Sequence, residues 1–409
     1  MQAAWQRWRW ALLAAAVTLG GFTALLVFPS AFRLLGLREM NPVFADLVAV
    51  LAAGEAAQQG IDVYRGNPLD PFNRPHVYGP AWLFTGSLGL TRSDTGWLGT
   101  LLALGFIAAA VALCAPRTPR AALLTVAVLL SPPVVLALER GNNDLVIFLL
   151  LAGAAALVGR SGRLALPAAA ATLVAAAALK FYPLVCLPAL AAQRAGLRRA
   201  WPWMLAGALA FGAVWFAQRA DLARVFALAP EPATIFAYGL RLGDVTWQLL
   251  AGERFWLLLG ATPVLAAGSW WILRSAPALR ALVPLHGVAA AAAVAGAAGW
   301  VFCYAWTTNF PYRVLLLLLV VPLLLRAEAP RAAGHLLAGL LALGWLIAPL
   351  DWCATALDMD ATRTMLLHLL AFLTGAQQAL AFIFSAAVAV ALLGWARRIW
   401  PTWSVRPTD

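Results

Sequence analysis

Residues 11–28 read ALLAAAVTLGGFTALLVF, an apolar run that stops at Pro29. The segment Trp5-Gln-Arg-Trp-Arg-Trp10 precedes it, and such tryptophans suit a membrane interface while the arginines suit the cytoplasmic side. A helix needs about 20 mainly apolar residues to cross a bilayer. A cleaved signal peptide would have a shorter apolar core and small residues at a cleavage site. We therefore expect a retained membrane helix whose N-terminus is cytoplasmic.

The whole chain has the same apolar character. Of its 409 residues 63% are hydrophobic and 11% are charged, and the mean hydropathy is +0.83. Soluble domains carry about 25% charged residues, so these values exclude a soluble multi-domain enzyme and a disordered chain. A net charge of +12 would suggest nucleic acid in a soluble protein, but here the basic residues stand between apolar runs and indicate orientation in a bilayer. We expect a single all-α polytopic domain over residues 1–409, with no nucleic-acid partner.

The basic clusters decide how the apolar runs cross. Further runs lie at 97–115, 121–137, 144–159, 164–179, 182–193, 201–217, 255–273, 281–301, 312–325, 333–349 and 366–396. The stretch 77–90 is ambiguous, because 14 helical residues reach only about 21 Å of a ~30 Å hydrocarbon core. If it crossed, the later arginine clusters would face outward, against the positive-inside rule. If it stays at the interface, about 12 membrane helices result and both termini are cytoplasmic.

That topology separates the charges sharply. Inside lie 16 basic residues and two acids, Glu328 and Asp409, which leaves 29 − 16 = 13 basic and 17 − 2 = 15 acidic residues outside. The inside basic residues are Arg7, Arg9, Arg117, Arg120, Arg160, Arg163, Arg194, Arg198, Arg199, Arg274, Arg280, Arg326, Arg331, Arg397, Arg398 and Arg406. Carboxylate chemistry is therefore expected on the outer face. The topology also needs a two-helix hairpin over 164–193, since one long helix there would change the parity.

The predicted first outer loop, residues 29–96, has the richest polar chemistry. Asn41 and Pro42 look like a helix start, and Gly60 looks like its stop. Apolar side chains over 43–54 repeat at helical spacing, so we expect an interfacial helix lying on or in the bilayer surface. Asp46 falls on the apolar edge of that helix, where a carboxylate is unfavourable unless it is used or paired. It is either functional, or ion-paired with a nearby arginine, or extended toward water.

A proline-rich segment follows. Four prolines, Pro68, Pro71, Pro75 and Pro80, fix an extended and shaped loop. Tyr64, His76 and Tyr78 would give this loop aromatic and hydrogen-bonding surface, as a sugar pocket needs. Anchoring of the aromatic rings at the membrane interface explains each of them equally well. Asp62 is assigned to shaping the loop or contacting the acceptor.

Three later polar turns also lie at predicted outer helix ends. Glu139-Arg140-Gly141-Asn142-Asn143-Asp144 stands between apolar helices, and either asparagine could cap the second one. Capping does not explain a Glu, an Arg and an Asp together at membrane depth. Lys180 is the only lysine in the chain; it could bind phosphate, or its ammonium could extend to the interface. Asn309 and Arg313, four residues apart, could hold one anion, although an arginine at a membrane edge is usually an anchor.

Taken in order, these elements resemble glycosyltransferase family 87. The resemblance rests on Gly60-x-Asp62-x-Tyr64, Tyr78-Gly79-Pro80, the Gly141-Asn142-Asn143 turn, the K-x-Y-P motif in Ala178–Pro183, and the following cluster of Arg194, Arg198 and Arg199. It covers about residues 10–200, and the last third is similar only in hydropathy. Asn142 replaces the family's Gln, Val63 replaces a Pro, and residues 307–313 lack a His that the family carries. These departures put the identity of the sugar and of the acceptor in doubt.

The resemblance implies a GT-C fold and a polyprenyl-phosphate-mannose-dependent α-mannosyltransferase. The enzyme would lie in the bacterial inner (plasma) membrane, with its active site facing the periplasm or the cell exterior, and its acceptor would be a lipid or a glycan. Asp46 would be the general base, and Lys180 with Arg140 or Arg313 would hold the donor phosphate. The residues assigned to substrate binding are Asp62, Tyr64, His76, Tyr78, Asn142, Asn143, Asp144, Tyr182 and Asn309.

The implied chemistry is inverting transfer. Asp46 takes the proton of the acceptor hydroxyl while its oxygen attacks the anomeric carbon, and the lipid phosphate leaves. A phosphate leaving group needs no protonation, so we expect no metal or cofactor. Two other classes stay open. A transporter or flippase of lipid-linked sugars should show charges at the bilayer midplane and internal repeats. A non-catalytic envelope assembly factor would tolerate the loss of Asp46.

Overall fold

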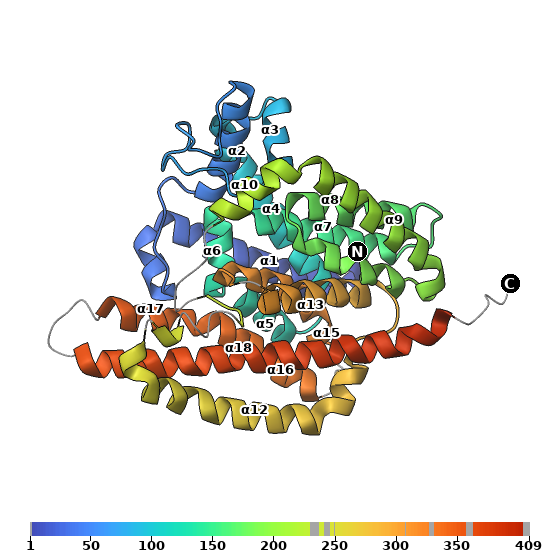
Figure 1. Cartoon of the computed structure of the whole chain (residues 1–409). Coiled ribbons are helices and arrows are strands. Elements are labelled where there is room, and N and C mark those ends of the chain that lie inside the picture. The colour runs from blue at the N-terminus through green and yellow to red at the C-terminus, as the bar shows by residue number, and fades with distance from the viewer. Residues whose placement is uncertain are drawn as a thin grey trace.

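A computed structural model describes residues 2–229, 237–240, 246–248, 250–306, 308–326, 331–356 and 363–403 (Figure 1). Within these ranges the chain is helical, and the only β pairing is one isolated bridge between Tyr238 and Asn309. Glu328, Arg406 and Asp409, which entered the charge count, and Thr307, which begins the stretch that lacks a histidine, lie outside the described residues. The expected all-α class is confirmed.

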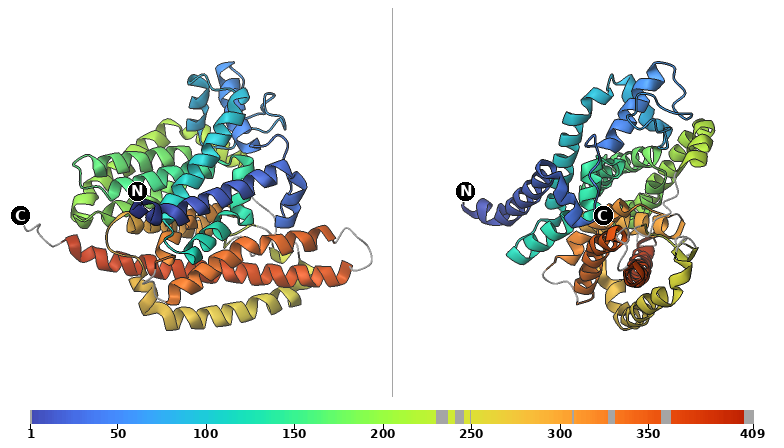
Figure 2. Two further views of the ribbon diagram at one scale, coloured as in Figure 1. Left: turned by 180° about the vertical axis from the view of Figure 1, so that it is seen from behind. Right: turned by 90° about the vertical axis from the view of Figure 1, so that its left-hand side faces the viewer.

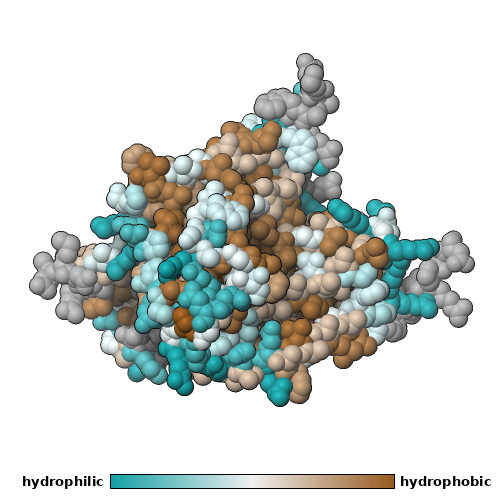
Figure 3. Space-filling model, turned by 90° about the horizontal axis from the view of Figure 1, so that it is seen from above, coloured by the Kyte–Doolittle hydropathy of each residue, from teal (hydrophilic) through white to brown (hydrophobic). Residues whose placement is uncertain are grey.

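Among the described residues, seven helices are long and apolar enough to cross a membrane, or eight if one bent pair counts as a single span. The seven are built from α1 (Gln2–Val27), α4 (Thr95–Cys114), α9 (Gly196–Ala217), α12 (Arg254–Leu282), α13 (Val288–Trp306), α16 (Arg331–Trp345) with α17 (Ile347–Ala356), and α18 (Arg363–Ile399). The bent pair is α5 (Pro119–Leu129) and α6 (Pro132–Arg140), which meet at 57°. Figure 3 shows a broad apolar surface between hydrophilic residues on its left and at its right-hand edge. The chain is a polytopic membrane protein.

The remaining apolar segments are shorter. They are α7 (Asn143–Val158), α8 (Ala165–Leu179), the 3₁₀ helix η4 (Tyr182–Ala192), and a broken run made of η6 (Pro311–Val314), α14 (Leu315–Leu318) and α15 (Val321–Leu324). By length and composition they do not pass as spans, so a count of 12 crossings stays a prediction. Most of them are buried inside the bundle, around α13, whose central residues are buried. Gly296 of α13 faces the Leu316 backbone, so two segments approach there more closely than a Cβ would allow.

The predicted hairpin over 164–193 is confirmed. The chain leaves α8 at Lys180, whose backbone is extended, and turns back into η4. At the turn, Lys180 pairs with Asp144 at the start of α7. At the far end, the Gln193 side chain donates to the Arg160 carbonyl just beyond the end of α7, at 3.3 Å. Because the two ends of η4 meet opposite ends of α7, a single long helix is excluded.

The stretch 77–90 does not form a membrane-spanning helix. It contains only η2 (Pro80–Leu83) and α3 (Phe84–Ser87), which pack on α2 (Ala45–Gln58). The backbones touch at Gly54 and Gly86, where a Cβ on either residue would collide with the other chain segment. The expected N-terminus of this helix is wrong, since Phe44 rather than Asn41 precedes its first turn. Gly60, in the left-handed region at φ 75°, terminates it as predicted.

That this helix lies on the bilayer surface stays a prediction, but its apolar stripe faces protein. Most of α2 is buried, including Leu47, Val50 and Leu51 of the apolar stripe. Protein covers the stripe: α2 contacts α3, η2, η3 (Arg92–Asp94), α4 and α6. Figures 1 and 2 show α2 and α3 projecting together at one end of the molecule, away from α12 and α18. Other short elements are η1 (Pro29–Leu35), α10 (Arg219–Leu228), η5 (Ala251–Glu253) and η8 (Trp400–Trp403).

Candidate functional site

A cavity of about 450 Å³ lies where α2, the C-terminus of α6, the α8–η4 turn, α9, α10 and residues 308–313 converge. We call it the Asp46 cavity. Its polar lining comes from Asp46, Arg74, Tyr78, Arg140, Lys180, Tyr182, Gln218, Thr308, Tyr312 and Arg313. Four of these side chains are cationic and one is a carboxylate, so the lining favours an anionic ligand.

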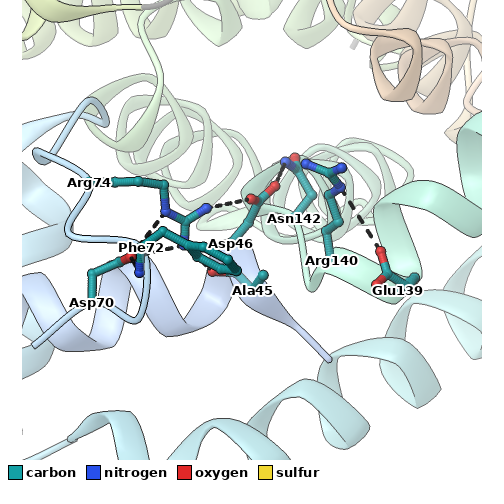
Figure 4. A network of polar contacts seen from close by, with 8 residues as sticks. All are labelled: Ala45, Asp46, Asp70, Phe72, Arg74, Glu139, Arg140 and Asn142. Atoms are coloured by element: carbon teal, nitrogen blue, oxygen red, sulfur yellow. Dashed lines mark hydrogen bonds and ion pairs between the residues drawn. The ribbon is translucent and has the colours of Figure 1, made fainter. Parts of the chain in front are cut away.

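Asp46 is held by groups from two distant parts of the chain (Figure 4). The residue is 6% exposed, and one carboxylate oxygen accepts a hydrogen bond of 2.6 Å from the Asn142 amide. The other oxygen is 3.6 Å from an Arg74 guanidinium nitrogen. An amide donor on one oxygen and a cation beside the other fix the orientation of the carboxylate. The ion pair foreseen as one alternative is present, and the carboxylate still lines the cavity.

Arg74 is the site residue that sequence reasoning missed. Its guanidinium pairs with Asp70 at 2.9 Å and donates 2.7 Å to the Ala45 carbonyl, directly before Asp46. The same group lies over the Phe72 ring, 4.9 Å from its centroid. Arg74 therefore ties the proline-rich loop to the first turn of α2. The sequence signal was its place in Asn73-Arg74-Pro75, where flanking prolines restrict the backbone around a charged side chain.

Asp144 organises a second charged cluster in the same cavity wall. One of its oxygens accepts from Lys180 at 2.8 Å, from the Tyr182 hydroxyl at 2.8 Å and from Arg313 at 3.0 Å. Asp144 is 1% exposed and lies behind these three side chains, which do line the cavity. Predicted site residues from three separate parts of the sequence are thus brought together: Asp144, the neighbouring pair Lys180 and Tyr182, and Arg313. Lys180 shares a cavity with Asp46, as the shared-site hypothesis requires.

Asn142 links the two clusters. Its side-chain oxygen accepts from the backbone N–H of Asp144 at 3.0 Å and so caps α7, while its amide nitrogen donates to Asp46. The predicted capping role is confirmed, and Asn142 acts on Asp46. Gly141, at φ 57°, ends α6 and makes the turn tight enough for both contacts. Asn143 is buried, and its amide nitrogen has no hydrogen-bond partner among the described residues.

Arg140 is the least engaged cation of the cavity. Its Nε lies 3.9 Å from Glu139, and that nitrogen is buried without a hydrogen-bond partner in the described part of the chain. Glu139 itself is turned away, because its other oxygen accepts from the Met40 backbone at 2.8 Å. Arg313 likewise has a buried Nε without a recorded partner within the described ranges. Both guanidinium groups retain donors that an incoming anion would satisfy.

Seven of the nine predicted substrate contacts do not line this cavity. Three of them, Asn142, Asn143 and Asp144, belong to the clusters described above, and the other four are Asp62, Tyr64, His76 and Asn309. Asp62 is exposed and pairs with Arg224 of α10 at 2.6 Å, and this hydrogen bond lowers the Asp62 pKa. Tyr64 packs in a small apolar cluster, where burial raises its pKa to about 12. His76 lies edge-on between the Tyr64 and Tyr78 rings, and burial lowers its pKa to about 4.

Asn309 is the fourth. Its amide donates to the Cys303 and Tyr238 carbonyls, so it holds two backbones together, whereas Arg313 pairs with Asp144. The expectation that Asn309 and Arg313 grip one anion together is wrong in this arrangement. Tyr78 and Tyr182, in contrast, line the cavity as predicted.

The other half of the cavity is apolar. Its wall is formed by α9 and α10 and by Phe181 of the α8–η4 turn; the lining side chains are Phe181, Phe211, Val214, Trp215, Leu222, Val225, Phe226 and Ala229. Aromatic rings make this wall continuous, since Phe226 contacts both Phe181 and Trp215. The cavity thus places a charged pole beside an apolar one, which suits an amphiphilic ligand with an anionic head.

Compared with protein-family models, with curated proteins and with solved structures, the chain matches none of them. The roles of its residues are therefore argued from geometry and chemistry.

Proposed function

We propose that the protein is a membrane glycosyltransferase that transfers a sugar from a polyprenyl-phosphate donor to an acceptor hydroxyl on the outer face of the membrane. The Asp46 cavity carries the proposal. It offers one oriented carboxylate, four cationic side chains and an apolar wall in a single space. A polyprenyl-phosphate sugar has an apolar tail, an anionic phosphate and a polar sugar, so its three parts correspond to these three kinds of surface. The resemblance to glycosyltransferase family 87 makes mannose the first sugar to test.

Asp46 is assigned the role of general base. It accepts the proton of the acceptor hydroxyl as that oxygen forms a bond to the anomeric carbon of the sugar. The bond from that carbon to the phosphate oxygen breaks, and its electron pair leaves with the polyprenyl phosphate. Attack opposite the leaving group inverts the anomeric configuration. Asn142 and Arg74 fix the position of the Asp46 carboxylate, which lines the cavity that would receive the acceptor hydroxyl.

The leaving phosphate gains charge, which the cations stabilise. Lys180 and Arg313 share the single carboxylate of Asp144, whereas Arg140 has only a weaker, 3.9 Å contact with Glu139. We therefore assign the first phosphate contact to Arg140, supported by Arg313 through its unpaired Nε. Lys180 supports this pole with its remaining N–H donors. Preorganised donors in a partly dry site stabilise developing charge strongly.

The test uses purified protein, a panel of radiolabelled polyprenyl-phosphate sugars that includes mannose, and lipid and glycan acceptors. Release of polyprenyl phosphate and labelling of the acceptor are both measured. Asp46→Asn is expected to lose transfer while it still binds the donor, because the amide keeps the shape and cannot take a proton. Asp62→Asn is the matched control: Asp62 also pairs with an arginine but lies outside the cavity.

Two outcomes would overturn the proposal. If Asp46→Asn transfers sugar as fast as the unchanged protein, Asp46 is not the general base. Movement of an intact lipid-linked sugar across proteoliposome membranes, without release of polyprenyl phosphate, would favour a flippase.

A further inference from the structure

A second cavity lies far from Asp46, between α12, α16 and α18. It has a volume of about 490 Å³ and an almost wholly apolar lining that includes Ala267, Gly339, Leu380 and Phe384. Its polar members are Trp271 and His335, joined by a 3.1 Å hydrogen bond from the indole N–H to the imidazole Nδ1. We call it the His335 groove. Figure 2 shows α12 and α18 running side by side at the end of the molecule opposite α2.

The Trp271–His335 pair of the groove lies near an arginine-rich end of these helices. Arg274 lies three residues beyond Trp271, and Arg331 lies four residues before His335 on the antiparallel α16. At 1.5 Å per residue both arginines stand about 5–6 Å along the helices from the Trp271–His335 pair, on the same side. Both side chains are exposed. Arg280 and Arg398 lie further toward the same end, where α12 meets α18 at Gly394.

The described residues at this end carry charge of one sign. Five arginines of these helices lie toward it, namely Arg274, Arg280, Arg331, Arg397 and Arg398, and the sequences of α12, α16 and α18 contain neither Asp nor Glu. Within the described residues, Arg274 and Arg331 make no ion pair with a carboxylate, although Arg274 lies over the Trp270 ring at 4.9 Å. Elsewhere the protein supplies carboxylates for its buried cations, as at Asp144. The exposed guanidinium groups of Arg274 and Arg331 can therefore accept an anionic ligand, since the described helices place no carboxylate beside them.

His335 adds a donor at the mouth of the groove. Because its Nδ1 accepts from Trp271, the neutral ring carries its proton on Nε2 and can donate from that atom. The side chain is exposed and lies about one helical turn inside the level of Arg331. In a phospholipid, ester carbonyl acceptors lie just inside the headgroup phosphate. Along the helices, the arginines, the imidazole and the apolar groove therefore succeed one another in the same order as the phosphate, the ester groups and the acyl chains of a phospholipid.

We propose that the His335 groove is a binding site for an anionic phospholipid, with its headgroup phosphate between Arg274 and Arg331 and an acyl chain in the groove. By the topology predicted from the charges, this lipid belongs to the cytoplasmic leaflet, where anionic headgroups attract basic residues. The site is independent of the Asp46 cavity and of the proposed transfer reaction.

The test is native mass spectrometry of the detergent-purified full chain. The protein is titrated with phosphatidylglycerol and with phosphatidylcholine of the same acyl chains, so that only headgroup charge differs. Phosphatidylglycerol is expected to be retained in preference. Arg274→Gln with Arg331→Gln should weaken its binding roughly tenfold, because each basic residue near a lipid surface contributes appreciably. Arg160→Gln with Arg163→Gln removes two exposed arginines beyond α7 and should leave binding unchanged.

A second variant tests the groove itself. Ala267→Phe fills the acyl-chain space without changing charge and should weaken binding of phosphatidylglycerol, while competition by glycerol phosphate, which has no acyl chain, should be weak. The proposal is overturned if the Arg160/Arg163 variant loses as much lipid as the Arg274/Arg331 variant, if both lipids bind equally, or if Ala267→Phe is silent. A dimer that the Ala267→Phe variant separates would instead assign the groove to a second copy of the chain. Thermal midpoints identify any variant that fails to fold, and Arg331→Gln alone then replaces the double variant.

Discussion

The Asp46 cavity and the His335 groove are similar in volume, about 450 and 490 Å³, and differ in how their charges are compensated. Around Asp46 the protein supplies both signs: Asp46 faces Arg74, and Asp144 faces Lys180 and Arg313. Around His335 the helices supply cations without carboxylates. Internal compensation holds side chains in fixed geometry, as a reaction requires. Uncompensated charge at a surface is suited to recruiting a ligand of opposite sign.

The largest effect is expected from Asp46. Removal of a positioned general base lowers the rate by about 10²–10⁴-fold. Asp46→Asn should therefore reduce transfer by at least about 100-fold, measured as release of polyprenyl phosphate, with donor affinity little changed. If the Arg274/Arg331 variant loses as much transfer activity in detergent as Asp46→Asn, the two cavities do not have separate roles. The His335 groove would then be required for the transfer reaction.

Asp144→Asn should produce the largest loss of stability. It leaves Lys180 and Arg313 buried beside a neutral amide, and breaking one side of a buried ion pair typically costs about 3–5 kcal/mol. We expect a marked fall in the thermal midpoint of the purified protein. Adding Lys180→Met to Asp144→Asn should restore part of it, because one of the stranded charges is removed. A double variant less stable than Asp144→Asn alone would show that Lys180 is held by packing rather than by charge.

Variants of Lys180 distinguish its role in phosphate binding from its role as an ion-pair partner of Asp144, and their expected effects are smaller. Lys180→Met leaves Asp144 paired with Arg313 and Tyr182, so stability should change little while transfer slows roughly tenfold from the loss of one cation near the phosphate. Lys180→Arg keeps the charge but brings a broader planar head into a fixed cluster, and should also slow transfer. Full activity in Lys180→Arg together with full activity in Lys180→Met would reduce Lys180 to a structural partner of Asp144.

Some features could be predicted from the sequence, because they depend on composition, on the spacing of charges or on the residues next to a helix end. The all-α membrane class followed from composition, the hairpin followed from the parity of arginine clusters, and the capping role of Asn142 followed from its place before an apolar helix. Asp46, Lys180 and Tyr182 were predicted to share a site because their motifs stood in a recognisable order. These inferences depend on short-range patterns or on the bilayer, which acts on every segment alike.

Pairing across the fold was not readable. Arg74 reaches Asp46 from 28 residues away, and Asp144 meets Arg313 across 169 residues, distances over which sequence periodicity says nothing. Asn309 was placed with Arg313 because they are four apart, yet the short η6 turn separates their side chains. The apolar stripe correctly predicted which face of α2 is buried, but not that protein buries it. A pattern of apolar residues does not distinguish burial by lipid from burial by protein.

His76 gives a pH-dependent test of the loop that carries Arg74. Its pKa is lowered to about 4 by burial, whereas the unfolded value is near 6.5. Between those values the unfolded chain binds the proton and the folded loop does not, so stability falls as pH drops from 6.5 toward 4, by up to about 1.4 kcal/mol per unit. Thermal midpoints and proteolysis of the loop at pH 7 and pH 5.5 should show this, and His76→Phe should flatten it. If His76→Phe shows a pH response of the same size, other titratable groups cause the loss of stability.

The smallest effect is expected at Asp62, and it sharpens the contrast between buried and exposed charges. Asp62 and Arg224 form a 2.6 Å ion pair whose side chains are each 42% exposed, so solvent screens it and its net contribution is small. The hydrogen bond to Arg224 lowers the Asp62 pKa, so whatever stability the pair gives is present above the unfolded value and is lost only as pH falls below it. Asp62→Asn, Arg224→Gln and the double variant should therefore have nearly the same thermal midpoint and transfer rate as the unchanged protein at pH 7.

The pair joins α10, which forms part of the cavity wall, to the proline-rich loop. A large loss of transfer in either single variant, restored by exchanging the two charges as Asp62→Arg with Arg224→Asp, would show that α10 must be held against the loop for the reaction, and that an exposed ion pair can matter as much as the buried ones.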